Sequence, residues 1–441
     1  MPTRQGIGDC PRLGYETGNR DPMNPLIVQL HGRRVGVLED DGRRMVFRYD
    51  AAWLADVGAL PLSRQLPLQS EPFEDQRVNV FFGGLLPEAD ARDQIARNLG
   101  ISANNDFAML ERIGGECAGA IALLSEEQVG AIPSISGLRW LSEGDAAEVM
   151  KQLPQRPLLA GDDGLRLSLA GAQVKLPVVL ETTASGVIRM SLPLGNTPST
   201  HIIKPEPQRF PGLAENEAWC MALARQIGMN TADVWVEKIG DVSCLIAKRY
   251  DRLPPTSDGT VQRLHQEDFC QALGYPSSRK YQQEGGPSLR ECFQLIRDWS
   301  TTPVLDIRHM LDAVIFAVVS GNADAHGKNH SFLYAGETRR MAPLYDQVCT
   351  MAWPELSSTL SMKVGSATRL EEVSPEHFKQ LCDQAKLGWP MVRERVGEVC
   401  QKMLDAIRDP LALPELRNES IRHAVTRRAE RMLELLAKCI A

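Results

Sequence analysis

The sequence lacks several features that mark common classes of protein. Its ten cysteines include no Cys-x-x-Cys pair, so neither a disulfide framework nor a zinc site is expected. No apolar run approaches the ~18 residues that a membrane span needs, and the N-terminus carries no apolar segment of the signal-peptide kind. Scattered cysteines fit a reducing compartment, so these absences together predict a soluble, cytoplasmic protein.

Two further absences concern charge and phosphate binding. The formal net charge is −7, which argues against strong non-specific binding of nucleic acid by the whole chain. Neither a G-x-G-x-x-G loop nor a Walker A sequence is present, which excludes the familiar glycine-rich phosphate loops. What remains is an ordinary globular composition, with 43% hydrophobic and 24% charged residues in a chain of 441. That length suffices for roughly two or three domains with substantial cores.

The alternation of turn residues and apolar runs predicts a strand-rich half followed by a helix-rich half. Residues 1–22 are polar and without periodicity, which predicts a disordered leader and makes Met23 an alternative start. Strands are expected at 26–30, 35–38, 45–49, 165–169, 174–180, 186–190, 200–203, 232–239 and 243–249. Helices are expected at 79–98, 105–113, 144–152, 214–227, 266–273, 288–298, 305–320, 375–386, 390–407 and 414–438.

Two short polar segments carry most of the chemical information. Asp324-Ala-His-Gly-Lys-Asn329 and Leu344-Tyr-Asp346 each follow an apolar run and supply an Asp, an Asn and a second Asp in order. Protein kinases need this set, because one Asp accepts the proton of the acceptor hydroxyl while the Asn and the other Asp hold Mg²⁺. The flanks differ from the usual pattern, since Asn322-Ala323 replaces His-Arg and Gln347 stands where Phe-Gly is usual. Turn and cap chemistry after a buried helix is the competing interpretation.

Three weaker features complete a pattern for phosphoryl transfer. Small residues fill the stretch 168–175, called here the phosphate loop, whose backbone N–H groups could meet phosphates, although a hairpin turn gives the same pattern. Lys204 ends an apolar strand, as the kinase strand lysine does, but solvated strand-end lysines are common. Glu217 on the following helix is placed to hold that lysine, with Glu215 as a competitor. The order of loop, Lys, Glu, Asp-x4-Asn and Asp is the order that kinase chemistry needs.

These residues resemble the HipA family of serine/threonine kinase toxins. The resemblance covers nearly the whole chain after residue 25, and its most specific blocks are Ala170-Gly-Ala-Gln173, Gln266-Glu-Asp268 and Asp324-x-His-x-Lys-Asn329. Gly285-Gly-Pro287 is among the other stretches that match. It implies an α+β, two-lobed protein-kinase-like fold, with a strand-rich N-terminal lobe, an extra N-terminal subdomain and an all-helical C-terminal lobe. The expected boundaries are a leader at 1–22, the N-terminal HipA-type subdomain at 23–130, a connector at 131–160, the ATP-binding lobe at 161–255 and the helical catalytic lobe at 256–441.

Carried over residue by residue, the resemblance makes Asp324 the catalytic base and Asn329 and Asp346 the metal ligands. Glu217 is expected to support the strand lysine, and Ser168 matches the family's autophosphorylated serine. ATP contacts are expected from the phosphate loop, the strand lysine, the hinge and the catalytic loop, at Ala170, Gly171, Ala172, Gln173, Lys175, Lys204, Lys248, Tyr250, His326 and Lys328.

Three of these positions have competing interpretations. Lys248 stands where a family relative has Glu, which leaves a backbone hinge but not a matching side chain. His326 either orients the loop, contacts ATP or packs beneath the loop. Lys328 either neutralises the transferring phosphate or is solvated.

The resemblance implies an ATP- and Mg²⁺-dependent serine/threonine protein kinase that acts as the toxin of a toxin–antitoxin pair and inactivates itself by autophosphorylation. The implied partners are a HipB-like helix-turn-helix antitoxin, operator DNA through that antitoxin, and a cytosolic protein substrate such as an aminoacyl-tRNA synthetase, notably the glutamyl enzyme. No membrane is implied. Two alternatives stay open, namely a small-molecule hydroxyl kinase and a catalytically weak subunit of a repressor complex.

Overall fold

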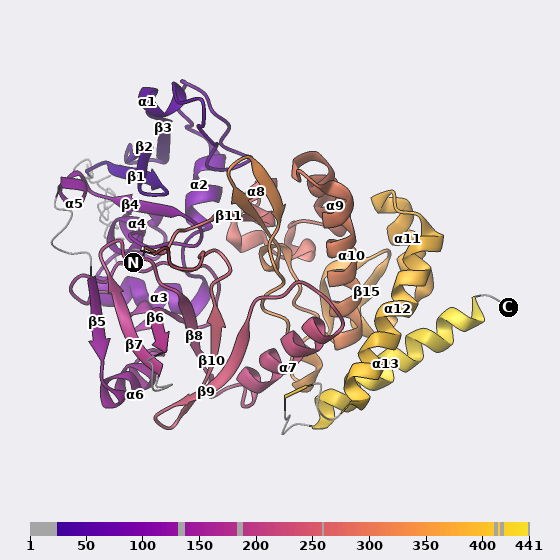
Figure 1. Cartoon of the computed structure of the whole chain (residues 1–441). Helices are drawn as coiled ribbons and strands as arrows, with labels where there is room; N and C mark the ends of the chain where they lie inside the picture. The colour runs from indigo at the N-terminus through magenta and orange to yellow at the C-terminus, as the bar shows by residue number, and fades with distance from the viewer. Residues whose placement is uncertain are drawn as a thin grey trace, which may run out of the picture.

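The computed structural model describes residues 24–130, 137–182, 188–257, 260–409, 413–414 and 419–439. The expected leader at 1–22 lies outside these residues. In Figure 1 the N-terminal subdomain lies above the large central sheet, and the helical C-terminal lobe lies to the right of them.

The N-terminal subdomain is built on a four-stranded antiparallel sheet in the order β3-β2-β1-β4. Its strands are β1 (Leu26–Leu30), β2 (Arg33–Asp40), β3 (Met45–Tyr49) and β4 (Ile121–Leu124). Its helices are α1 (Ala51–Leu54), α2 (Gln76–Gly83), α3 (Ala89–Leu99), α4 (Asp106–Ile113) and α5 (Glu126–Gly130).

The single helix expected at 79–98 is wrong, because the structure has two helices separated by the non-helical segment 84–88. Gly83 and Gly84 are weak helix formers, and Pro87 disfavours a helical conformation for the residue before it. Periodicity of the apolar residues continues across this break and therefore hides it. The break matters for function, since the segment 84–88 reaches the cleft described below.

A six-stranded antiparallel sheet, in the order β5-β7-β6-β8-β10-β9, forms the second layer. Its strands are β5 (Gly137–Leu141), β6 (Leu176–Thr182), β7 (Ile188–Leu194), β8 (His201–Pro205), β9 (Val234–Ile239) and β10 (Val242–Lys248). Helices α6 (Glu143–Gln152) and α7 (Leu213–Gln226) pack against β9 and β10. The strand expected at 165–169 is wrong, since only Leu167 pairs there, in an isolated bridge to Glu116. Strand β5 comes from the stretch expected as a connector and forms the edge of this sheet.

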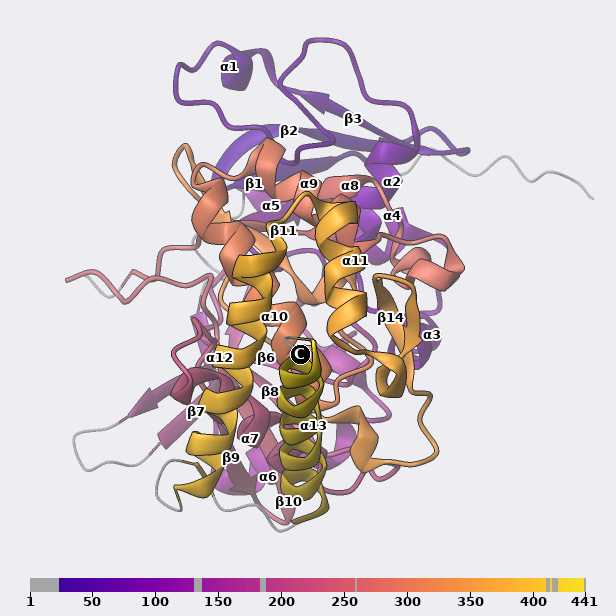
Figure 2. The same cartoon turned by 90° about the vertical axis from the view of Figure 1, so that its right-hand side faces the viewer.

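The C-terminal lobe is mainly helical. Its helices are α8 (Phe269–Leu273), α9 (Leu289–Trp299), α10 (Pro303–Ser320), α11 (Pro375–Ala385), α12 (Trp389–Arg408) and α13 (Glu419–Lys438). Helix α10 is buried over nearly all of its second half, which explains its almost continuous apolar sequence. Helices α12 and α13 lie side by side on the outer face of the lobe (Figure 2).

Short strands in this lobe overturn the expectation that it is all helical. They are β11 (His265–Asp268), β12 (Ser331–Ala335), β13 (Thr338–Met341), β14 (Thr359–Val364) and β15 (Ala367–Arg369). The helix expected at 266–273 therefore begins only at Phe269, after strand β11, and the side chain of Asp268 caps it. The strand is hard to recognise because its inward residues are polar. Glu267, for example, is fully buried and accepts a hydrogen bond from Ser63 Oγ at 2.6 Å.

One hydrophobic core is shared by the N-terminal subdomain and the central sheet, and a second core fills the C-terminal lobe. A buried charged network also ties the subdomain to the end of strand β10. Glu116 accepts from Arg249 at 3.0 Å and also from Arg252, while Asp251 pairs with Arg249 at 2.7 Å. The subdomain is therefore fixed against the sheet by both apolar packing and ion pairs.

Candidate active site

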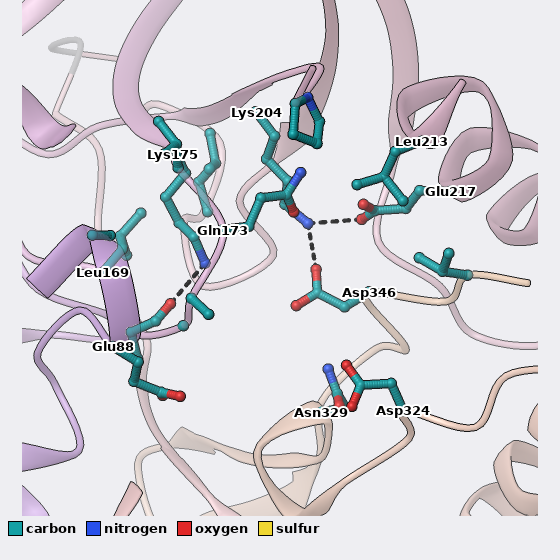
Figure 3. A pocket seen from close by; sticks show the side chains of 18 of the residues that line it. Glu88, Leu169, Gln173, Lys175, Lys204, Leu213, Glu217, Asp324, Asn329 and Asp346 are labelled. Carbon is teal, nitrogen blue, oxygen red and sulfur yellow. Dashed lines mark hydrogen bonds and ion pairs between the residues drawn. The ribbon is translucent and has the colours of Figure 1, made fainter. Parts of the chain in front are cut away.

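A cleft of about 1500 Å³ lies between the central sheet and the C-terminal lobe, with the N-terminal subdomain closing one side. Except for Ser168, the residues expected to act in catalysis and ATP binding all line it. Figure 3 shows Lys204 between two carboxylates, with Asp324 and Asn329 facing it from the C-terminal lobe. The structure thus brings together groups that lie far apart in the sequence.

The side chain of Lys204, on β8, is the central group that the sheet contributes to the site. Its ammonium donates to Glu217 Oε1 at 2.7 Å and also to Asp346 Oδ1. Burial alone would lower the pKa of Lys204, but the charges of Asp346 and Glu217 outweigh it and raise that pKa. Burial raises the pKa of Glu217 despite the lysine. Of the two candidate glutamates on α7, Glu217 is the one that pairs with Lys204.

Asp346 has a left-handed backbone, with φ of +54°, which non-glycine residues rarely adopt. This turn directs its carboxylate to Lys204. Burial would raise the pKa of Asp346, but Lys204 and Lys175 outweigh it and lower the pKa to about 2. Asn216, next to Glu217 on α7, holds the segment that follows Asp346. Its Oδ1 accepts from Cys349 N at 2.8 Å, and its Nδ2 donates to Cys349 O at 3.0 Å.

The C-terminal lobe contributes the catalytic loop, residues 324–329, which follows α10. Gly321 ends that helix in the left-handed conformation, and the Asp324 N–H donates to Asn322 Oδ1 at 2.9 Å. Asn329 Oδ1 accepts from the His326 N–H at 3.1 Å, which closes the loop as a short helical turn. The Asp324 carboxylate stays accessible in the cleft, and its position deep between the lobes raises its pKa by desolvation.

His326, within this loop, has a buried side chain. Desolvation lowers its pKa to about 3, so the ring is neutral at physiological pH. Its Nδ1 has no hydrogen-bond partner within the described part of the chain. Lys328 is also buried, and its ammonium donates to Asp268 Oδ2 at 2.8 Å and to the Gly84 carbonyl at 3.3 Å. The charge of Lys328 is thus neutralised within the protein, and it is not a solvated lysine.

The phosphate loop is fastened to the N-terminal subdomain. Ser168 is fully buried and its Oγ donates to the Leu85 carbonyl at 2.8 Å. The Glu88 N–H donates to the Gly171 carbonyl at 3.1 Å, next to an isolated bridge between Pro87 and Gly171. Ser168 therefore faces the segment 84–88 and not the cleft in this conformation.

Within the loop, Lys175 folds back so that its ammonium donates to the Ala170 carbonyl at 2.7 Å. Desolvation lowers the pKa of Lys175 to about 8. Gly171 has φ of +109°, and a Cβ there would lie 2.7 Å from Lys175 Nζ, so only glycine fits this turn. The loop is short, and residues 169–175 line the cleft.

The two expected hinge residues at the end of β10, Lys248 and Tyr250, differ in their exposure and contacts. Lys248 has an exposed side chain at the cleft wall, while its backbone N–H donates to the Asp233 carbonyl at 2.8 Å. Tyr250 donates from its hydroxyl to Gln266 Oε1 at 2.6 Å and stacks on Tyr345, with 5.7 Å between ring centroids. This stacked pair forms the back of the cleft.

Sequence analysis missed Glu88, Asp268, Lys280 and Tyr281. Glu88 Oε2 lies 2.8 Å from Lys280 Nζ, and Glu88 Oε1 lies 3.5 Å from Lys328 Nζ. These charged residues belong to three separate segments, so no local pattern connects them. The blocks Gln266-Glu-Asp268 and Gly285-Gly-Pro287 were the available signals, since both resemble the family without having a role in the expected ATP site.

The described residues contain no group of three or more His, Cys, Asp or Glu side chains that could hold a metal ion by themselves. The side-chain oxygens of Asn329 and Asp346 do fit a hard cation, because Mg²⁺ typically takes one or two protein oxygens together with the phosphates of a nucleotide. The donor chemistry is therefore suited to Mg²⁺ bound with ATP. Across the described residues, no helix is both long and apolar enough to span a membrane.

The two-lobed fold, the Lys–Glu pair and the Asp-x4-Asn loop together define a kinase. Comparison with known proteins agrees: residues 26–124 match the family described as HipA N-terminal domain, and residues 167–407 match the HipA-like C-terminal domain. The chain belongs to the HipA family of toxin kinases, and it is a serine/threonine-protein kinase.

Two relatives and one solved structure place the chain within that family. It is 45% identical over 387 residues to Y4mE of Sinorhizobium fredii (strain NBRC 101917 / NGR234), whose name describes it provisionally as a kinase. The match covers 87% of this chain and 90% of the relative. It is 29% identical to the serine/threonine-protein kinase toxin HipA of Shewanella oneidensis (strain MR-1), covering 94% and 95%. A chain in the structure of the Shewanella oneidensis MR-1 toxin–antitoxin complex of HipA, HipB and operator DNA superposes with a TM-score of 0.82 at 27% identity, covering 94% of this chain and 98% of that one.

Proposed function

We propose that this kinase transfers the γ-phosphoryl group of ATP to a serine or threonine hydroxyl of a cytosolic protein, and that it acts as the toxin of a toxin–antitoxin pair. The observation that carries the proposal is the convergence of Lys204, Glu217 and Asp346 with the Asp324–Asn329 loop on one cleft. Such a set serves phosphoryl transfer by positioning and charge stabilisation.

In the proposed reaction, Asp324 accepts the proton of the acceptor hydroxyl as the new O–P bond forms and the bond from Pγ to the β-phosphate oxygen breaks. Lys204, held by Glu217, contacts the ATP phosphates. Asn329 and Asp346 would hold Mg²⁺, which neutralises charge on the transferring phosphoryl group. The phosphate loop supplies backbone N–H groups, and the hinge near Tyr250 contacts the adenine side of the cleft.

The proposed partners follow from the relatives. The Shewanella oneidensis homologue is solved together with HipB and its operator DNA, and we infer a HipB-like antitoxin that joins this chain to an operator and co-represses the operon. An aminoacyl-tRNA synthetase, such as the glutamyl enzyme, is the proposed protein substrate by family resemblance. Phosphoproteomic comparison of cells with and without the induced protein would identify the substrate.

Transfer of γ-³²P from ATP tests the proposed activity. Asp324→Asn should reduce transfer roughly 10²-fold or more, because it removes the base while keeping the shape of the side chain. Asp298→Asn, at an exposed position of α9, is the matched control and should transfer at the wild-type rate. Wild-type transfer by Asp324→Asn would reject Asp324 as the base.

Ser168 is the proposed site of self-inactivation. A phosphate there adds nearly two negative charges at neutral pH, and the buried hydrogen bond to the Leu85 carbonyl could not accommodate them. Modification would therefore remove the phosphate loop from the cleft, and Ser168→Ala should prevent it. Mass spectrometry after incubation with ATP and Mg²⁺ tests this. An unmodified 165–175 peptide from protein that phosphorylates another substrate would contradict it.

A further inference from the structure

The segment 350–361 borders the cleft, and both of its ends are bonded to Ala323, the residue before Asp324. At one end, Thr350 Oγ1 accepts from the Ala323 N–H at 3.0 Å. At the other end, the Ala323 carbonyl accepts from the Ser361 N–H at 2.9 Å and from Ser361 Oγ at 2.8 Å. The residues between these two ends are therefore held beside the catalytic loop.

Two turns within this segment leave Trp353 and Leu356 at the cleft wall. The Trp353 N–H donates to the Thr350 carbonyl at 3.2 Å, and the Leu356 N–H donates to the Trp353 carbonyl at 3.0 Å. Both side chains line the cleft and are only half-buried. The C-terminal lobe thus presents apolar surface to the cleft on a segment that is anchored next to Asp324.

The segment 206–212, which follows β8, carries Phe210 on the opposite wall. The Phe210 N–H donates to the Pro207 carbonyl at 3.0 Å, and the Phe210 carbonyl accepts from the Leu213 N–H at 3.2 Å. The Phe210 ring meets the Trp353 ring edge-on, with 5.7 Å between centroids and 69° between planes. These two half-buried rings, called here the aromatic pair, connect the lobes across the cleft.

The register of β8 places the aromatic pair at the end of the cleft away from the hinge. The strand begins at His201, opposite the hinge residue Lys248, and ends at Pro205, just after Lys204. The chain therefore passes the group expected to contact the ATP phosphates before it reaches Phe210. The aromatic pair consequently lies beyond the phosphates, on the side from which an acceptor hydroxyl has to approach.

The surroundings of the aromatic pair favour an apolar occupant. Four further apolar residues close to the pair in sequence also line the cleft, namely Pro207, Pro211, Leu213 and Leu356. Removal of an apolar side chain from water onto such a surface is favourable, and aromatic side chains supply large contact areas at recognition sites. A hydroxyl that reaches Asp324 belongs to a chain that continues along the segment anchored to Ala323. The occupant is therefore a stretch of the protein substrate.

We propose that Phe210 and Trp353 bind an apolar side chain of the protein substrate, close in sequence to the serine or threonine that is phosphorylated. The aromatic pair would then contribute to the choice of acceptor, while Asp324 and Lys204 serve the transfer itself. The inference rests on the proposed kinase function and deepens it by naming the chemistry that the acceptor needs.

A peptide library tests this site, with one central serine and one fixed residue at each neighbouring position in turn. With γ-³²P-labelled ATP as donor, the wild type should prefer phenylalanine, leucine or methionine over alanine at one position by roughly 10-fold, because burial of a large apolar side chain is worth that much. Trp353→Ala should abolish this preference and raise the KM for the preferred peptide. The KM for ATP should stay unchanged, because Lys204 and the hinge are intact.

Three further variants separate recognition from a structural role. Phe210→Ala should show the same loss as Trp353→Ala, and the conservative change Trp353→Phe should keep most of the preference. Trp140→Ala is the matched control, since Trp140 is an exposed tryptophan on the edge strand β5, away from the cleft, and should behave like the wild type.

The outcomes distinguish this inference from the kinase proposal. Transfer by the wild type without preference for an apolar neighbour would overturn the inference and leave the kinase proposal standing. A preference that survives in both alanine variants of the pair, or an equal loss in Trp140→Ala, would do the same. Self-phosphorylation without transfer to any peptide would also overturn it, because an apolar site at the acceptor end has to take a peptide. Absence of all transfer by the wild type would overturn both.

Discussion

Lys204 on β8 and Glu217 on α7 form a buried ion pair, with 2.7 Å between Nζ and Oε1. The two residues are 13 positions apart and belong to different elements, so the pair fixes the helix against the sheet. Asp346 approaches the same ammonium from the C-terminal lobe. Lys204 thus links both lobes across the cleft.

Lys204→Met should weaken ATP binding by at least about 10-fold, because the variant loses the cation that faces the phosphates and leaves two carboxylates there. The effect on stability should be smaller, since the raised pKa of Glu217 lets that carboxyl take up a proton in the variant. Isothermal calorimetry with ATP measures the affinity. Lys238→Met, at an exposed position of β9, should bind ATP like the wild type. Unchanged affinity in Lys204→Met would reject the phosphate contact.

Asp346→Asn should change the Mg²⁺ requirement. The substitution removes the charge expected to attract the cation and one of the two partners of Lys204. Transfer at saturating ATP should fall roughly 10²-fold, and the Mg²⁺ concentration for half-maximal rate should rise. Titration of the transfer rate with Mg²⁺ measures both. Asp409→Asn, just after α12, provides a control remote from the cleft. A wild-type Mg²⁺ titration in Asp346→Asn would show that Asp346 is not a metal ligand.

The contribution of Glu267 to stability should fall as the pH rises from about 4.5 to about 7, because burial raises the pKa of Glu267 from 4.5 to about 7. The folded state binds the proton of the Glu267 carboxyl more tightly than the unfolded state does. Protonation of Glu267 therefore stabilises the folded protein fully below the ordinary pKa of 4.5, and this stabilisation is lost as the pH rises through the raised pKa of about 7. Glu267→Gln removes this titration. Between pH 5 and pH 8, the Tm difference between Glu267→Gln and the wild type should therefore change in favour of the variant, as ~1 pKa unit corresponds to ~1.4 kcal/mol.

Glu237→Gln is the control for that comparison, since Glu237 is an exposed residue of β9. Its Tm should follow the wild-type pH profile. Parallel profiles of all three proteins would contradict a raised pKa of Glu267.

The sequence predicted those parts of the fold whose apolar residues are periodic. Helices α4, α9 and α10 and strands β1 and β3 lie within a few residues of their expected bounds. Helix α9 buries one regular face, whereas β1 and the second half of α10 are continuous apolar runs, and both patterns are easy to recognise. Strand β11 was missed since its buried His265 and Glu267 look like surface residues in the sequence. Their burial depends on partners from the N-terminal subdomain, which no local pattern reveals.

For the site, the order of chemical groups along the chain predicted what the cleft brings together. Lys204, Glu217, Asp324 and Asp346 have charges that a kinase needs at recognisable spacings. Their supports could not be predicted in the same way. Glu88, for example, reaches the cleft through the non-helical break at Pro87, which no local pattern reveals.

Glu88→Gln should loosen the phosphate loop. The Glu88 carboxylate pairs with Lys280 at 2.8 Å and faces Lys328, while its backbone N–H donates to the Gly171 carbonyl. Removing the charge leaves Lys280 uncompensated at a half-buried site and should shift the segment 84–88 that holds the loop. Hydrogen exchange of peptides from 168–175 should therefore become faster. Ser168 phosphorylation should also speed up, because the Ser168 hydroxyl separates more easily from the Leu85 carbonyl.

Asp93→Asn is the control for both measurements. Asp93 is exposed on helix α3, which follows Glu88, and its substitution should change neither of them. Equal exchange of the 168–175 peptides in Glu88→Gln and the wild type would show that the loop is held without the Glu88 carboxylate.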